Sequence, residues 1–228
     1  MIAAERIEEV AAGLRAACVR ESGASFVQKE DALLHKTIAH ALSLASDVRS
    51  TAQLFGVDIP LRAPNGDEYL SRFATTIGSQ VAVPRAWSAL DRLLVDAHEA
   101  QHVLQHKHGV DAGWWPRITT HSVLYLAGVV AHSEAGEEYV GKVEGDAYAV
   151  TQSIRAFLTG HPAPLADCLR PLVESYNLLG VGAQMAESVL RSHYATIAAG
   201  LVPNVTMAVV AHDWLETHAA DLRGAVTL

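Results

Sequence analysis

The spacing of hydrophobic residues along the chain predicts a mainly helical protein. Apolar positions three and four residues apart, many of them alanine, indicate two N-terminal helices at about residues 2–21 and 26–48. The same spacing predicts helices at about residues 85–107, 120–133 and 136–158. The remainder of the chain again has a helical pattern, and the sequence contains no internal repeat and no low-complexity tract.

A short β element precedes the third of these helices. The run from Phe73 to Val83 contains two β-prone stretches on either side of Gly78-Ser79, a dipeptide that suits a tight hairpin turn. Pro84 ends the second stretch, because proline lacks the N–H that a strand ladder needs. We therefore expect an α+β fold that is predominantly helical and has a small β hairpin or sheet.

One segment interrupts the periodic pattern strongly enough to suggest a boundary. Residues 56–67 contain two prolines and an Asn-Gly pair, which favour turns over regular structure. We predict an N-terminal helical segment at residues 1–55, followed by a domain with additional C-terminal helices at residues 56–228.

The composition indicates a folded globular protein and excludes some partners. The chain has 228 residues, of which 50% are hydrophobic and 18% are charged, so it can bury a full core. Its net charge is −8 and no cluster of lysine or arginine is present, whereas binding to phosphate needs a concentrated basic surface. We expect no nucleic acid and no membrane among its partners.

The cysteines and the N-terminus suggest a reducing compartment. Cys18 and Cys168 lie far apart and form no CxxC motif, so neither a disulfide framework nor a cysteine zinc site is indicated. The first nine residues are too acidic for a secretory signal. The uncharged stretch 194–211 approaches the length of a membrane span, but an internal glycine and proline favour two buried segments separated by a turn. We expect a cytoplasmic protein.

Residues 98–102 carry the one motif that suggests a chemistry, His-Glu-x-x-His, within the predicted helix 85–107. Two helical residues four positions apart differ by about 40° in direction and about 6 Å in rise, so His98 and His102 can share one metal ion. Glu99 then lies beside the metal as a potential general base.

A catalytic zinc site needs a third protein ligand, and Glu144 is the strongest candidate. It lies at the edge of the apolar face of the predicted helix 136–158. Gly141 and Gly145 flank it, and residues this small allow another helix to approach closely. A carboxylate in this position suits a ligand that faces a neighbouring helix.

His108 is the main competitor for the third position. It occupies the place of the last histidine in the metzincin pattern HExxHxxGxxH, but Gln105 replaces the glycine that turns the chain back to the metal. We therefore expect the helix to continue and His108 to point away from His98. His121, His132 and Asp146 are further candidates for the same position.

The order of a β hairpin, an HExxH helix and a second helix with Glu-x-x-Ala resembles the gluzincin branch of the zincin metallopeptidases, in its small, soluble, bacterial or phage-type form. The resemblance covers about residues 70–158. It implies a zincin-like core in which His98, His102 and Glu144 bind Zn²⁺ and Glu99 polarises the attacking water. The chain would then be a zinc-dependent peptidase, a hydrolase, that acts on a peptide or protein.

The same resemblance implies a role for the predicted hairpin. The strand that ends at Val83 would be an edge strand that pairs with an extended substrate through backbone hydrogen bonds.

The sequence departs from the family pattern near the third ligand. Thermolysin-like enzymes carry an aspartate four residues after this ligand to orient a zinc-bound histidine, and this chain has Tyr148 there. Asp146 is a substitute at a different helical angle. The residues available to stabilise an oxyanion are Tyr139, Tyr148, His193 and Tyr194, with the last two favoured because they lie on a separate helix.

Two further interpretations remain open at this point. The first is a zincin-fold module that binds metal without peptidase activity and has a binding or structural role. The second is an all-helical interaction protein without metal, suggested by the alanine-rich N-terminal helices.

Overall fold

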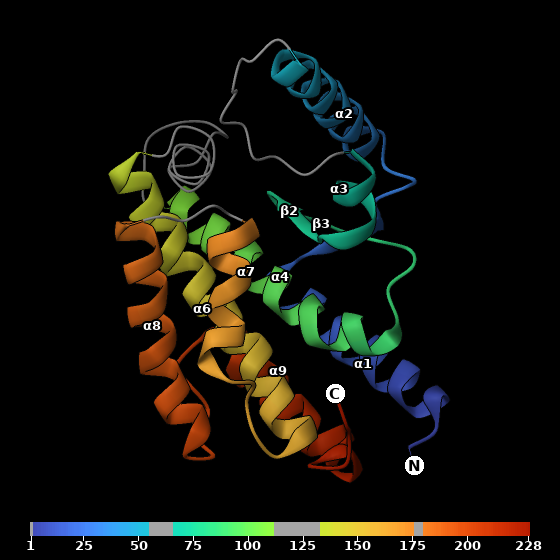
Figure 1. The fold of residues 1–228 in the computed structure, drawn as a ribbon. Helices are drawn as coiled ribbons and strands as arrows, with labels where there is room; N and C mark the ends of the chain where they lie inside the picture. The colour runs from blue at the N-terminus through green and yellow to red at the C-terminus, as the bar shows by residue number, and fades with distance from the viewer. Residues whose placement is uncertain (1, 55–65, 112–132, 176–179) are drawn as a thin grey trace. The chain divides into compact units, whose positions relative to one another are not determined.

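The computed structural model describes residues 2–54, 66–111, 133–175 and 180–228, and these are mostly helical with one small sheet (Figure 1). This confirms the predominantly helical α+β class. The helices are α1 (Ala4–Ser22), α2 (Leu33–Leu54), α3 (Gly66–Arg72), α4 (Ala89–Asp111), α6 (Glu134–Thr159), α7 (Leu165–Ser175), α8 (Val181–Ala198), α9 (Thr206–His218) and the short 3₁₀-helix η1 (Ala220–Leu222). The strands are β1 (Ser25–Gln28), β2 (Thr75–Ile77) and β3 (Gln80–Val83).

The chain divides into two compact units, which are described separately. The larger unit contains Met1–Ala24 and Ser88–Leu228, and the smaller unit contains Ser25–Trp87. The boundary expected between residues 55 and 56 lies outside the described residues, as does the helix expected at residues 120–133 except for its last residue, Ser133.

The smaller unit holds a three-stranded sheet in the order β1-β3-β2. The turn at Gly78, with a φ of 63°, joins β2 and β3 as an antiparallel pair and confirms the expected hairpin. β1 lies parallel to β3, with Ser25 opposite Gln80. The helix expected from residue 26 is therefore wrong at its start, because the four residues of β1 pair with a strand far away in sequence.

The expectation that the strand ending at Val83 is an edge strand is also wrong. β3 is the central strand of the sheet, with β1 on one side and β2 on the other. Its backbone groups are used by these two neighbours, and Val81, Ala82 and Val83 are fully buried. A substrate has no free β3 edge to pair with.

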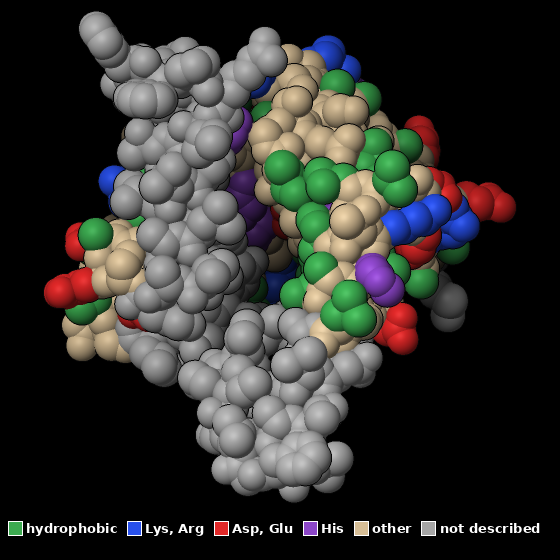
Figure 2. Space-filling model, turned by 90° about the horizontal axis from the view of Figure 1, so that it is seen from above, with side chains coloured by type: hydrophobic (Ala, Val, Ile, Leu, Met, Phe, Trp, Pro, Cys, Tyr) green, Lys and Arg blue, Asp and Glu red, His purple; other side chains and the backbone are tan. Residues whose placement is uncertain are grey.

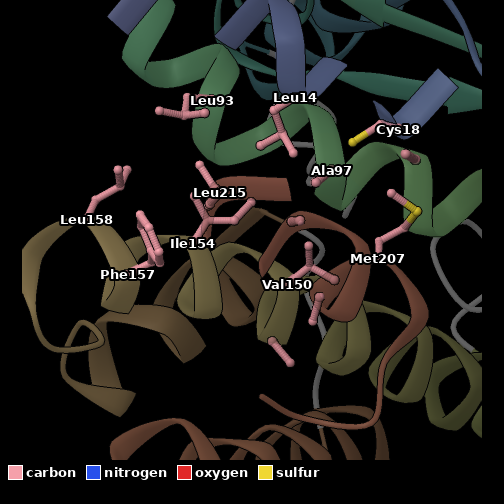
Figure 3. Close-up of a cluster of buried hydrophobic side chains, with 14 of the residues drawn as sticks. Leu14, Cys18, Leu93, Ala97, Val150, Ile154, Phe157, Leu158, Met207 and Leu215 are labelled. Carbon is pink, nitrogen blue, oxygen red and sulfur yellow. The ribbon is translucent and has the colours of Figure 1, made fainter. Parts of the chain in front are cut away.

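The larger unit is built around a core shared by four helices. α4 packs against α1, α6 and α9, and α6 also packs against α9. Figure 3 shows Leu14 of α1 and Leu93 of α4 close to Ile154 of α6 and Leu215 of α9, and all four are at most 1% exposed. These helices therefore have one continuous apolar interior.

Side-chain and glycine caps define ends of α4 and α6. At the start of α4, the Ser88 hydroxyl accepts from the Asp91 N–H at 3.1 Å, while the Asp91 carboxylate accepts from the Ser88 N–H at 2.9 Å. At the start of α6, the Ser133 hydroxyl accepts from the N–H of Gly136. α6 ends at Gly160, whose φ of 85° suits a left-handed helix end.

Two glycines allow close packing between α6 and α8, which lie side by side in Figure 1. A Cβ added to Gly141 would lie 2.3 Å from the carbonyl oxygen of Gly182 in α8. A Cβ on Gly145 would lie 2.9 Å from the side chain of Val189. The close approach expected at these glycines is confirmed, and the helix that makes it is α8.

The uncharged stretch at residues 194–211 is divided by a turn, as expected. α8 ends at Ala198, Gly200 has a φ of 74°, and α9 begins at Thr206. None of the helices in the described part of the chain combines the length and the apolar character that a bilayer crossing requires.

Charged side chains of both signs occur together on the surface. On the face shown in Figure 2, acidic and basic side chains of the described residues lie near one another. Ion pairs formed within each unit include Arg6 with Asp221 at 2.7 Å and Arg85 with Asp31 at 2.6 Å. These pairs are exposed and contribute little to stability.

Candidate metal centre

Three side chains from two packed helices converge in the larger unit. α4 supplies His98 and His102, and α6 supplies Glu144. The Nε2 atom of His98 lies 3.8 Å from one carboxylate oxygen of Glu144, and that of His102 lies 3.6 Å from the other. One ligand atom from each residue lies within 4.8 Å of the others. The predicted ligands are therefore neighbours, and their binding of a metal stays a prediction.

All three side chains of this group are buried, which is unusual for ionisable residues. Glu144 is fully buried, and His98 and His102 are each 7% exposed. Buried ionisable groups are normally paired or coordinate a metal, because an isolated buried charge is costly. The arrangement therefore needs either a shared proton or a cation between the side chains.

The pKa values of the two histidines move in opposite directions. Burial, together with the neighbouring His102, lowers the pKa of His98 to about 3. Burial also acts to lower the pKa of His102, but the carboxylates of Glu144 and Glu99 outweigh it and raise this pKa to about 9. The carboxylates therefore favour positive charge at His102.

Each histidine uses its other ring nitrogen to bind a polar side chain. Nδ1 of His98 lies 3.1 Å from the hydroxyl of Thr151, and Nδ1 of His102 lies 2.8 Å from the side-chain oxygen of Gln105. Both Nε2 atoms are then left on the side of Glu144. Hydrogen bonds of this kind orient the histidine ligands of metal sites.

The donor set fits zinc. Two imidazole nitrogens and one carboxylate oxygen are typical of catalytic zinc, which keeps a fourth position for water. Two ligand atoms about 2.1 Å from one tetrahedral zinc lie about 3.4 Å apart. The observed separations of 3.6 and 3.8 Å between Glu144 and the two histidines are close to that value.

The general base candidate is buried beside this group. Glu99 is 7% exposed and follows His98 directly on α4. Its negative charge contributes, after that of Glu144, to the raised pKa of His102, so it acts electrostatically on the site. The structure thus places a second carboxylate near the three candidate ligands.

The competing third ligands do not join the group within the described residues. α4 continues through Gln105 as expected, and His108 is an exposed residue in its last turn. Asp146 pairs with His193 of α8, with 2.9 Å between the carboxylate oxygen and Nε2. His121 and His132 lie outside the described residues.

Tyr148 is the oxyanion candidate that the structure brings to the site. Its ring meets that of His98 edge to face, with 5.1 Å between the ring centroids. Burial and then the charge of Glu144 raise the pKa of its hydroxyl, so Tyr148 keeps its proton at neutral pH. His193 is engaged by Asp146, and Tyr194 lines a separate cavity of about 460 Å³ that none of the candidate ligands lines.

Sequence reasoning did not identify Thr151 and Gln105. Gln105 follows His102 by three residues, so helical spacing alone could have indicated contact between the two. Thr151 lies seven residues after Glu144, two helical turns along α6, and carries no comparable signal. It reaches His98 only because of how α4 and α6 pack.

Among the described residues, this trio is the only group of three or more His, Cys, Asp or Glu side chains arranged to hold a metal ion. Comparisons of the chain with protein-family models, curated proteins and solved structures found no match. The residues and geometry of the site therefore provide the basis for its functional interpretation.

Proposed function

We propose that this protein is a zinc-dependent peptidase of the gluzincin type. In this proposal His98, His102 and Glu144 hold Zn²⁺, and Glu99 is the general base. The observation that supports it most strongly is the convergence of two buried imidazoles and a fully buried carboxylate from α4 and α6, within 4.8 Å of one another. A chance HExxH on a surface helix would not bring a buried glutamate to both histidines.

The proposed mechanism assigns a role to each described side chain. Bound zinc supplies Lewis-acid chemistry, which polarises a carbonyl and makes a water molecule more acidic. Glu99 accepts a proton as the water oxygen attacks the amide carbon, and it passes that proton to the amine nitrogen as the carbon–nitrogen bond breaks. Thr151 and Gln105 keep the two imidazoles oriented.

Zinc content and peptide cleavage of the Glu99→Gln variant test the proposal together. Elemental analysis of protein purified without a histidine tag should find about one zinc per chain in both the parent and the variant. The zinc-loaded parent should cleave members of a peptide library, and the variant should not, because a neutral amide accepts no proton. Cleavage by the variant at the parent rate would contradict the role of Glu99.

A metal-binding module without peptidase activity is the second candidate. It is favoured by the replacement of the expected aspartate with Tyr148 and by the central position of β3 in its sheet. Stoichiometric zinc without cleavage of any peptide would support this candidate. Protein without a stoichiometric metal would instead support a helical interaction protein.

A further inference from the structure

Gln105 connects the second candidate ligand to the helix that carries the third. Its side-chain oxygen lies 2.8 Å from Nδ1 of His102, and its side-chain nitrogen donates to the carbonyl oxygen of Val143 at 3.0 Å. Val143 directly precedes Glu144 in α6. One amide therefore links a candidate ligand in α4 to the backbone next to a candidate ligand in α6.

The chemistry of these partners determines which way the amide faces. The Val143 carbonyl can only accept a hydrogen bond, so the Gln105 nitrogen must be the atom directed at it. The Gln105 oxygen then faces His102 and can only accept, which requires a proton on Nδ1 of His102. The lone pair of neutral His102 is consequently on Nε2, the atom 3.6 Å from Glu144.

The contact between His98 and Thr151 places no such requirement on the His98 ring. The Thr151 hydroxyl can either donate or accept, so this contact alone is compatible with both neutral tautomers of His98, which also forms a hydrogen bond with the backbone of Ala147. Of these two contacts, only the one to Gln105 selects a tautomer.

We propose that Gln105 is a positioning residue of the metal centre. It keeps Nε2 of His102 available to the metal and holds α4 at a set distance from the α6 backbone beside Glu144. This inference rests on the proposed zinc site, and it does not depend on whether the protein cleaves peptides.

Two substitutions at Gln105 separate its role as the hydrogen-bond acceptor for His102 from its role as a link between α4 and α6. Gln105→Leu removes both hydrogen bonds, and we expect zinc affinity to fall by about 10- to 100-fold. Gln105→Glu keeps an acceptor for Nδ1 but places a carboxylate against the Val143 carbonyl. We expect this variant to melt at a lower temperature than the parent while binding zinc within about threefold of the parent, since the acceptor is retained.

Gln101→Leu provides a matched control on the same helix. The Gln101 side chain is buried and accepts from the N–H of Met207 at 3.2 Å, without contacting the Nδ1 atom of either histidine. Its removal should lower the melting temperature, because a buried donor loses its partner, but should leave zinc affinity unchanged. This control distinguishes a loss of positioning from a general loss of stability.

Zinc affinity can be measured by competition with a chromogenic chelator, and the ligand geometry by the visible absorption of the Co²⁺-substituted protein. A weakened affinity and an altered Co²⁺ spectrum in Gln105→Leu, with both restored in Gln105→Glu, would support the proposal. Parent-like affinity in Gln105→Leu, or equal losses in both Gln105 variants, would overturn it. If the parent binds zinc but cleaves no peptide, the peptidase proposal fails while these affinities still decide the role of Gln105.

Discussion

The hydroxyl of Thr151 lies 3.1 Å from Nδ1 of His98, although the two residues belong to different helices. Thermolysin-like enzymes carry an aspartate four residues after the third ligand to orient a zinc-bound histidine, and the position four residues after the proposed ligand Glu144 holds Tyr148. Thr151 lies almost one helical turn further along α6 and makes the contact with His98. The partners of this ring are thus an uncharged side chain and the backbone of Ala147.

We predict that Thr151→Val lowers zinc affinity by about 10- to 100-fold, because His98 loses the side chain that, together with the Ala147 backbone, orients its ring. Valine has nearly the same shape as threonine, so the packing between α4 and α6 should be preserved. Chelator competition measures the change in affinity. Ser153→Ala is the control, since the Ser153 hydroxyl donates to the carbonyl of Ala149 within α6. Equal affinities for the Thr151 and Ser153 variants would contradict the orienting role.

Zinc binding should depend on pH through His102. Although burial lowers it, the nearby Glu144 carboxylate raises the pKa of His102 to about 9, whereas the pKa of His98 is about 3. At neutral pH zinc must therefore displace one proton from His102 and none from His98. Apparent zinc affinity should rise about tenfold per pH unit up to about pH 9 and then level off.

Chelator competition at several pH values tests this dependence, after correction for protonation of the chelator itself. The same series with the chelator alone is the control. An affinity that stays constant between pH 6 and pH 8 would show that zinc displaces no proton from the site.

Gly141→Ala should lower the free energy of unfolding by about 1–3 kcal/mol, because the added methyl group overpacks the contact between α6 and α8. A Cβ there would lie 2.3 Å from a backbone oxygen of Gly182, which cannot rotate away as a side chain can. Urea unfolding monitored by circular dichroism measures the change.

Gly200→Ala is the control, because it measures the cost of replacing a glycine at a position where the added methyl group meets no crowding. Among the described residues, nothing apart from Gly200 and its chain neighbours lies within 4 Å of a Cβ added at Gly200. Its φ of 74° makes backbone strain the main cost, about 1 kcal/mol. If Gly141→Ala were as stable as the parent, α6 and α8 could move apart without lowering the free energy of unfolding, which would contradict the prediction.

The motif itself was predictable because it depends on local geometry. His98 and His102 lie on one face of any regular helix, and the apolar spacing by itself indicates a helix there. Glu144 was selected by its place at the edge of an apolar face. Its proximity to both histidines then depended on the packing of α4 against α6.

The sheet was predictable only in part, for a related physical reason. The hairpin between β2 and β3 is a local structure with a recognisable turn at Gly78. The pairing of β1 with β3 joins residues more than fifty positions apart, such as Phe26 and Val81. No local pattern contains that information, so the predictions of a helix start at β1 and of an edge strand at β3 were wrong.

The sequence by itself determined the helical spacing of His98 and His102, the presence of α4 and α6, and the glycines that allow close packing, whereas α4 begins and ends about four residues later than its apolar spacing predicted. Only the tertiary structure decided that Glu144 faces both imidazoles and that Thr151 and Gln105 bind their other ring nitrogens. The physical reason is that periodicity and capping act within a few residues. Contacts between helices instead depend on how each helix rotates and approaches its neighbour as the shared core packs.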